Sequence, residues 1–154
     1  MPGSSDEPVL VVGLESGIYA IRLGHVREIM RPLSTEVVAG APSFVLGVTR
    51  VRGEPAPVVD LARFIADGPA LPRPDGRWIR VDLRGRSLVL SVDSVRGVRH
   101  LAAEVLSALP SLLAGAERNA VEKLALLDEE LVRVLDSGLR MPDDVWSALE
   151  GMAS

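Results

Sequence analysis

Cysteine is absent from this chain of 154 residues, which excludes a disulfide framework, a cysteine-ligated zinc site and a thiol nucleophile. Histidine is nearly absent, because only His25 and His100 occur, far apart and outside any metal-binding spacing. We expect both to be ordinary surface or strand-end residues. Phosphate-cradling glycine loops and the G-x-S-x-G nucleophile motif are missing too. These absences favour a protein that is not an enzyme and that needs no metal or other cofactor.

Lysine is represented by Lys123 alone, so nearly all of the 17 basic residues are arginine. They are scattered among 21 acidic residues, for a net charge of −4. Without a basic stripe, binding to nucleic acid has little electrostatic support. Arginine suits bidentate pairing with carboxylates at protein interfaces, although genome composition explains the same bias equally well.

Long apolar runs are also missing, since none approaches the roughly 18 residues that a membrane-spanning helix requires. The opening residues, MPGSSDEP, do not resemble a charged-then-apolar leader. We therefore expect a cytoplasmic protein with no direct membrane insertion, and a disordered lead over residues 1–8.

Aromatic side chains make up only 3% of the chain, so the core must be built from Val, Leu, Ile and Ala. Abundant β-branched Val, together with 14 Gly and 11 Pro, favours short strands joined by turns. A chain of this length buries about 68–70% of its unfolded surface, so one compact unit is expected.

Residues 44–65 are the stretch around which the remaining chain is expected to be arranged. Two apolar runs flank Arg52-Gly53-Glu54, which predicts a hairpin with its reversal there. Gly47 and Gly53 are able to take a positive φ. Pro55 and Pro57 cannot donate ladder hydrogen bonds. They therefore place the start of the second strand at an edge, with one flank free for a partner.

Other segments are assigned from apolar alternation and from turn residues. We expect strands at residues 9–12, 18–23, 34–39, 78–83 and 88–93, with 95–101 continuing the second sheet. Residues 26–30 fit a strand or one helical turn, and residues 120–135 fit one helix or two strands. A short helical turn at 41–46, loops at 66–77 and 107–119 (briefly helical at 112–115) and a C-terminal helix at 142–154 complete the prediction.

A weak internal echo links two segments, because Arg52-Gly53 precedes an apolar strand that ends at Asp60, and Arg84-Gly85 precedes one that ends at Asp93. It suits two similar small barrels, although chance also explains it. One reading makes the two aspartates converge as paired carboxylates of a small enzyme. A strand-end Asp more often accepts hydrogen bonds from the following turn.

Gly-Val-Thr-Arg-Val-Arg-Gly at residues 47–53, followed by Pro-Val-Val-Asp-Leu at residues 57–61, resembles the central signature of the CheW coupling proteins of bacterial chemosensory arrays. Further stretches, in the order of the family, are similar at residues 18–21, 26–29, 37–42, 91–95 and 126–135. The resemblance covers roughly residues 9–136, and several spaced motifs in order are far more specific than one.

The resemblance implies an all-β fold of two interleaved five-stranded SH3-like barrels over residues 9–141, with a short C-terminal helix. It favours two strands at residues 121–135, joined by a turn at Asp128-Glu129. The implied function is that of a non-catalytic adaptor between a CheA-type histidine kinase regulatory domain and the cytoplasmic tip of a methyl-accepting chemoreceptor. The alternative is a CheW-like module that binds a nonstandard partner or small ligand in a motility or developmental pathway.

Arg52 matches the family's arginine in the Arg-Gly turn, which is implicated in coupling, and Glu28 matches an acidic position on the first barrel. The expected partner-binding residues are Arg52, Glu28, Gly53, Val26, Val48 and Glu54. Each has a plainer reading: Arg52 forms a local ion pair with Glu54 worth under about 1 kcal/mol, and Glu28 is an outward carboxylate.

The apolar candidates for a trough between the barrels are Val26, Ile29, Val48 and Val92, because a docking helix inserts apolar side chains into an apolar groove. Their plainer reading is core. The chain departs from the family pattern at Arg50, where asparagine is common, and in the Pro-rich loop over residues 67–76.

Overall fold

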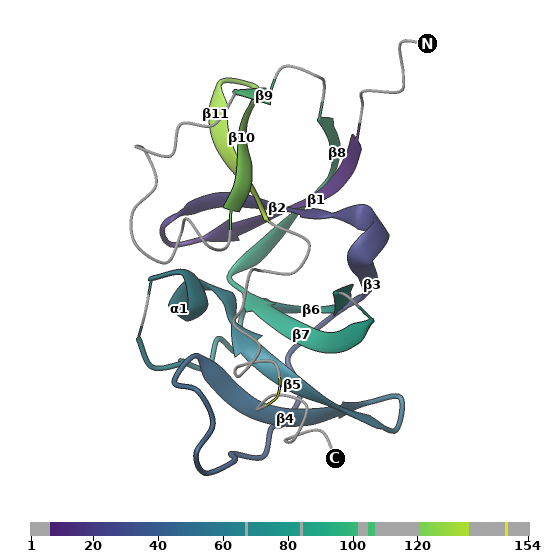
Figure 1. Cartoon of the computed structure of the whole chain (residues 1–154), viewed down its shortest axis with the longest axis vertical. Helices are drawn as coiled ribbons and strands as arrows, with labels where there is room; N and C mark the ends of the chain where they lie inside the picture. Colours follow the sequence, from purple (N-terminus) through teal and green to yellow (C-terminus); the bar gives the residue numbers. More distant parts are fainter. Residues whose placement is uncertain are drawn as a thin grey trace.

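Two β-sheets make up most of the computed structural model, which describes residues 7–66, 68–83, 85–101, 105–106, 121–135 and 147. The five-stranded sheet has the order β3 (Val26–Met30), β6 (Arg77–Leu83), β7 (Arg86–Val92), β5 (Glu54–Asp60) and β4 (Val45–Val51). The six-stranded sheet has the order β8 (Ser94–Leu101), β1 (Glu7–Leu14), β2 (Gly17–Arg22), β11 (Glu130–Leu135), β10 (Val121–Leu127) and β9 (Val105–Leu106). Figure 1 shows one sheet above the other.

The same pairing scheme builds both sheets. In each, a hairpin (β6–β7 or β1–β2) pairs antiparallel with an edge strand (β3 or β8). Its second strand then runs parallel to β5 or β11, which forms a hairpin with β4 or β10. The first two strands of the chain join the last strands, so the two halves are interleaved, and the predicted all-β class is confirmed. β9 adds only two residues as a sixth strand.

Period-2 alternation explains the core. Along β1, Leu10 and Val12 belong to a large cluster that draws on strands of both sheets, whereas Val9 and Val11 belong to a smaller cluster within the six-stranded sheet. A third cluster lies within the five-stranded sheet. It includes Val51 of β4, and Met30 of β3 packs against it. Arg52, which follows β4, also bonds Glu28 of β3, so the sheet curls until its two edge strands approach each other.

The central hairpin is confirmed as β4 and β5. Its second strand pairs with β4 from Glu54 but with β7 only from Val58. The Pro-containing start of β5 therefore has β4 alone beside it among the described pairings, as the two prolines predicted.

The prediction was wrong between the third and fourth strands. The strand expected at residues 34–39 is a single bridge between Glu36 and Val48. The helical turn expected at 41–46 is reduced to one turn, in which the N–H of Val45 donates to the carbonyl of Pro42 at 3.0 Å, and β4 begins at Val45. The end of that segment pairs with β5 instead, with Val45 opposite Val59.

Two further differences concern α1 and β8. Residues Leu61–Ala66 form a short helix that was not expected, and Asp60 caps it by accepting a hydrogen bond from Arg63 N–H at 3.4 Å. The strand β8 does not continue the sheet of β7. It pairs with β1 in the six-stranded sheet instead, because the chain crosses between the sheets at Asp93, whose N–H donates to the carbonyl of Gly13 at 3.1 Å.

At the termini, β1 begins at Glu7, so Glu7 and Pro8 belong to the strand rather than to the lead expected over residues 1–8. The expected loop at 107–119, with its short helical piece, and, Ser147 apart, the helix at 142–154 lie outside the described residues. No helix within the described part of the chain is long and apolar enough to cross a membrane.

Gly47 gives a direct test of this architecture. Its φ is 152°, and an added Cβ would overlap the backbone carbonyl of Glu36, which bridges to the neighbouring Val48. We expect Gly47→Ala to lower the free energy of unfolding by about 3 kcal/mol, through backbone strain and displacement of that bridge. Chemical denaturation measures the change.

Gly24→Ala is the matched control, because an added Cβ there meets nothing within 4 Å. It should stay within about 0.5 kcal/mol of the parent protein. Equal effects of the two substitutions would contradict the described packing of residue 36 against β4.

Candidate functional site

The reversal between β4 and β5 is a two-residue loop in which both residues have positive φ, 53° at Arg52 and 83° at Gly53. This combination is the one that two-residue type I′ hairpins require. Glycine adopts it freely, whereas arginine adopts it at a cost. The loop carries Arg52 outward, and its side chain is 73% exposed.

Arg52 is held by Glu28 on β3, at the other edge of the five-stranded sheet. Nε and Nη2 of Arg52 donate to the two carboxylate oxygens of Glu28, each at 3.2 Å. Arg80 of β6 adds a weaker ion pair with Glu28 at 3.9 Å. The expected local pair of Arg52 with Glu54 is therefore replaced by a bidentate contact across the closed sheet, because the curl of the sheet brings β3 beneath the turn.

The structure gathers four of the six predicted site residues at this end: Arg52, Gly53, Glu54 and Glu28. Glu54 opens β5 and is exposed. Val26 and Val48 are half-buried on the strands that lead to it. Both backbone hydrogen-bonding groups of Val48 are bonded to Glu36, N–H and C=O at 2.9 Å each.

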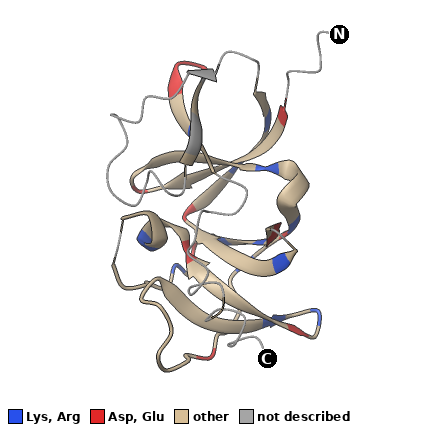
Figure 2. Ribbon diagram, viewed as in Figure 1, with Lys and Arg blue, Asp and Glu red and all other residues tan. Residues whose placement is uncertain are grey.

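The turn also carries charge beyond the Arg52 pair. Nη1 of Arg50 donates to the carbonyl of Gly53 at 3.2 Å, which tightens the loop. In the described part of the chain Arg50 has no carboxylate partner, so its positive charge is uncompensated. Figure 2 shows basic and acidic positions side by side along this hairpin end.

The apolar candidates divide into core and surface. Val92 is fully buried in the large cluster shared by the sheets, whereas Ile29 on β3 is 45% exposed. Val26 packs against the same cluster from its rim. The interior between the sheets is thus filled by side chains, and exposed apolar surface next to Glu28 comes from Ile29.

Histidine contributes no charge to this region. His25 directly precedes β3. Burial, together with the charges of Arg22 and Arg27, lowers the pKa of its imidazole. The imidazole is therefore neutral near pH 7. Among the described residues no group of three His, Cys, Asp or Glu side chains is placed to hold a metal ion.

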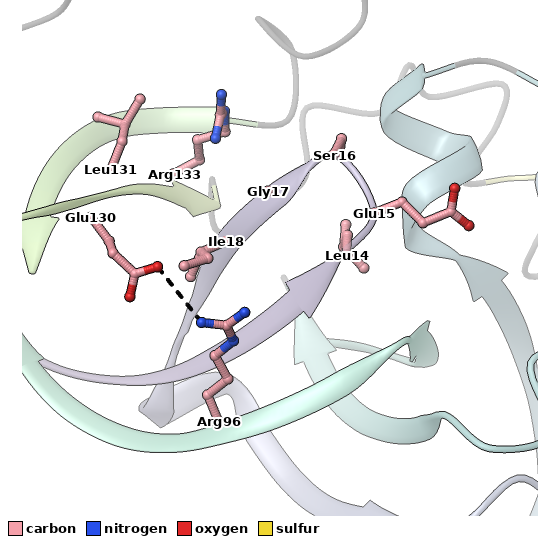
Figure 3. Close-up of a pocket in the computed structure, with 9 residues that line it drawn as sticks. All are labelled: Leu14, Glu15, Ser16, Gly17, Ile18, Arg96, Glu130, Leu131 and Arg133. Carbon is pink, nitrogen blue, oxygen red and sulfur yellow. Dashed lines mark ion pairs between the residues drawn. The ribbon is translucent and has the colours of Figure 1, made fainter.

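A cavity of about 460 Å³ lies at one end of the six-stranded sheet (Figure 3), between the β1–β2 turn, β8 and β11. It is lined by Leu14, Glu15, Ser16, Gly17, Ile18, Arg96, Glu130, Leu131 and Arg133. Arg96 and Glu130 face each other across it at 3.8 Å. A smaller cavity of about 140 Å³ shares Ile18, Arg96 and Glu130 with it. The lining mixes charges of both signs with aliphatic surface.

Asp60 and Asp93 do converge, but on an arginine that the sequence did not single out. Arg73 donates to Asp60 at 3.3 Å and to Asp93 at 2.8 Å. Both oxygens of Asp60 also accept backbone N–H groups. This arrangement fits the turn-binding interpretation of the strand-end aspartates better than an acid-base pair.

Comparison with known proteins adds independent findings. A model of the CheW-like domain family matches residues 8–139. The "Probable chemotaxis protein CheW" of Rhizobium etli is 24% identical over 118 residues, which cover 77% of this chain and 76% of that protein. Protein FrzA of Myxococcus xanthus is 39% identical over 101 residues, 62% of this chain and 61% of its own length.

A solved structure matches the fold. The crystal structure of scaffolding protein TtCheW from Thermoanaerobacter tengcongensis is similar with a TM-score of 0.74 and 25% sequence identity. The match covers 88% of this chain and 90% of that chain.

The energetics of the Arg52–Glu28 pair can be measured separately from binding. Because Arg52 is mostly exposed, we expect a coupling energy of about 0.2–1 kcal/mol from the double-mutant cycle of Arg52→Ala and Glu28→Ala. Urea denaturation of the four proteins gives this value. A coupling energy above about 2 kcal/mol would instead show that the pair stabilises the fold.

Proposed function

The chain belongs to the CheW-like domain family, and from this premise we propose that it is a non-catalytic adaptor that couples methyl-accepting chemoreceptors to a CheA-type histidine kinase. The family match covers most of the chain. The similar structure is that of a scaffolding protein, and one relative is named as a chemotaxis protein. A cytoplasmic location is part of this proposal, since both partners would be met there.

The observation that carries the proposal is the exposed, pre-oriented guanidinium of Arg52. Its fork is aligned by Glu28, so little conformational entropy is lost when a partner carboxylate approaches. The exposed pair with Glu28 is worth little, so it can be shared or exchanged at low cost. The regulatory domain of the kinase would dock on this end, with Gly53 and Glu54 inside the contact.

The receptor tip is helical in this proposal, and a helix docks by its apolar face. Ile29 offers exposed aliphatic surface on β3, one residue from Glu28, and Val26 lies at the rim of the same strand. Val48 is half-buried on β4. We place the receptor contact along β3, because the interior between the sheets is already filled.

Coupling by such an adaptor needs no chemical step. A scaffold that touches both partners transmits a change in receptor packing only if it binds the receptor's states with different free energies. Glu28 and Ile29 are consecutive on β3, so their side chains point to opposite faces. A receptor contact at Ile29 that moves the backbone of this strand would also move Glu28 and its pair with Arg52.

A second candidate is a module that binds a small ligand or nonstandard partner. The mixed cavity near Arg96 and Glu130 favours it. Affinity capture from the native organism discriminates the two readings, because partners that include neither a kinase nor a receptor would support the second.

Charge reversal at Arg52 tests the kinase contact. We expect Arg52→Glu to weaken binding to the kinase regulatory domain by at least about tenfold, which corresponds to a loss of 1.4 kcal/mol in binding free energy. The new carboxylate, beside Glu28, would repel the partner carboxylate that Arg52 is proposed to bind. The thermal midpoint should stay nearly unchanged, since the side chain is exposed. Calorimetry of binding and of unfolding measures both.

Arg96→Glu is the control, because Arg96 is also an exposed arginine in an ion pair, on the other sheet. It should bind the kinase domain as the parent does. A large loss of folding in Arg52→Glu, or an equal loss of binding in both variants, would remove Arg52 from the interface.

Residues 142–154 lie beyond the segment that matches the family. We expect their deletion to leave the dissociation constant for the kinase domain unchanged, measured by the same calorimetry. Loss of binding by a folded, truncated protein would reassign this tail as part of the interface.

A further inference from the structure

The loop between α1 and β6 takes no part in the proposed function, yet it contains Arg73, whose side chain donates four hydrogen bonds to carboxylates. Arg73 is only 10% exposed. Its three guanidinium nitrogens donate to three carboxylates, those of Asp60, Asp93 and Glu15. An arginine with this many charged partners is the centre of an ion-pair junction rather than a solvated loop residue.

Asp60 is the buried anchor of this junction, because its side chain is fully shielded from solvent. Oδ1 accepts from Nε of Arg73, and Oδ2 accepts from Nη2, both at 3.3 Å. The N–H of Leu71 adds a hydrogen bond at 3.0 Å. Asp60 therefore ties the end of β5 in the five-stranded sheet to the loop.

Nη1 of Arg73 reaches in the other direction. It donates to Asp93 at 2.8 Å and to Glu15 at 3.3 Å. Asp93 is the single residue between β7 and β8, where the chain passes from one sheet to the other. Glu15 lies in the β1–β2 turn of the six-stranded sheet. One guanidinium thus contacts both sheets and their crossing point.

The charge of Arg73 is secure. Burial alone would lower its pKa, but the hydrogen bond to Asp60 and the charges of Asp60 and Asp93 outweigh burial and raise the pKa above its ordinary value. The three carboxylates therefore face a permanent cation.

Hydrophobic packing between the sheets supplies a less directional constraint. The large shared cluster is aliphatic, and the hydrophobic effect has no preferred direction. Hydrogen bonds from a planar fork are directional, and they hold their acceptors at set positions. Packing holds the sheets together, whereas a fork bound to both of them can define the angle between them.

We propose that Arg73 is a positioning residue that fixes the orientation of the two sheets relative to each other at their crossing point. The consequence for coupling rests on the proposed function: the hairpin end at Arg52 and the six-stranded sheet are then presented to their partners in one relative geometry. Glu15 is the adjustable arm, since its side chain is 73% exposed and lines the open cavity (Figure 3).

The absence of cysteine makes a spectroscopic test straightforward. Spin labels at Ser87→Cys on β7 and Glu129→Cys in the β10–β11 turn report the distance between the sheets. Labels at Ser87→Cys and Glu54→Cys report a distance within the five-stranded sheet. All three positions are exposed, and pulsed electron spin resonance gives each distance distribution in the full chain without any partner.

In the Arg73→Gln background we expect the between-sheet distribution to broaden by about twofold, as packed layers become free to shear, and the within-sheet distribution to stay unchanged. Arg73→Lys keeps the charge without the fork, and should give an intermediate width. An unchanged between-sheet distribution in a folded Arg73→Gln protein would overturn the proposal. Equal broadening of both distributions would do the same, because it would show general loosening.

Glu15→Ala keeps the test decisive if Arg73→Gln does not fold, because loss of an exposed carboxylate costs little stability. It removes only the arm that reaches the β1–β2 turn, and the between-sheet distribution should broaden measurably. A distance distribution identical to the parent's would show that the contact of Arg73 with Glu15 does not set the orientation of the sheets, and would overturn the proposal. Since no kinase or receptor is present, failure here is distinguishable from failure of the adaptor function.

Discussion

Packing of aliphatic side chains between the two sheets is the interaction on which the other features of this structure depend. Alternate residues of β1, such as Leu10 and Val12, join side chains of the five-stranded sheet in one buried cluster. Each fully buried side chain of this kind contributes about 1.5–3 kcal/mol. With aromatic residues at 3% of the chain, aliphatic side chains supply most of this packing, together with the buried Tyr19. The curl of the sheets in turn carries the Arg52 turn over β3.

Much of the fold was predictable because the signals were local. Alternating apolar residues predicted most strands, and Arg52-Gly53 predicted the central reversal. The predictions failed where distant partners decide the structure. Residues 34–39 lack enough alternation to form a strand and pair only through Glu36. β8 contains apolar residues as β7 does, and no local signal shows that Asp93 carries the chain into the other sheet.

The candidate site was predicted in part, and for a different reason. Arg52 and Glu28 were identified by resemblance to the CheW family, but their contact was not, since 24 positions separate them and Glu54 lies nearer in sequence. The sequence showed that the segments ending at Asp60 and Asp93 are similar, but it did not show the structural reason. The two strands, β5 and β7, lie side by side in one sheet, so their ends meet at Arg73, in a Pro-rich loop without any periodic signal.

Coupling requires that one chain hold two partners at once, and the most direct measurement is light scattering with size-exclusion chromatography. The protein would be mixed with the CheA-type kinase of its own organism, with and without a receptor signalling fragment. The adaptor account predicts a ternary complex whose mass includes all three chains. Elution of the protein alone, with neither kinase nor receptor bound, would contradict the account and leave the fold without this function.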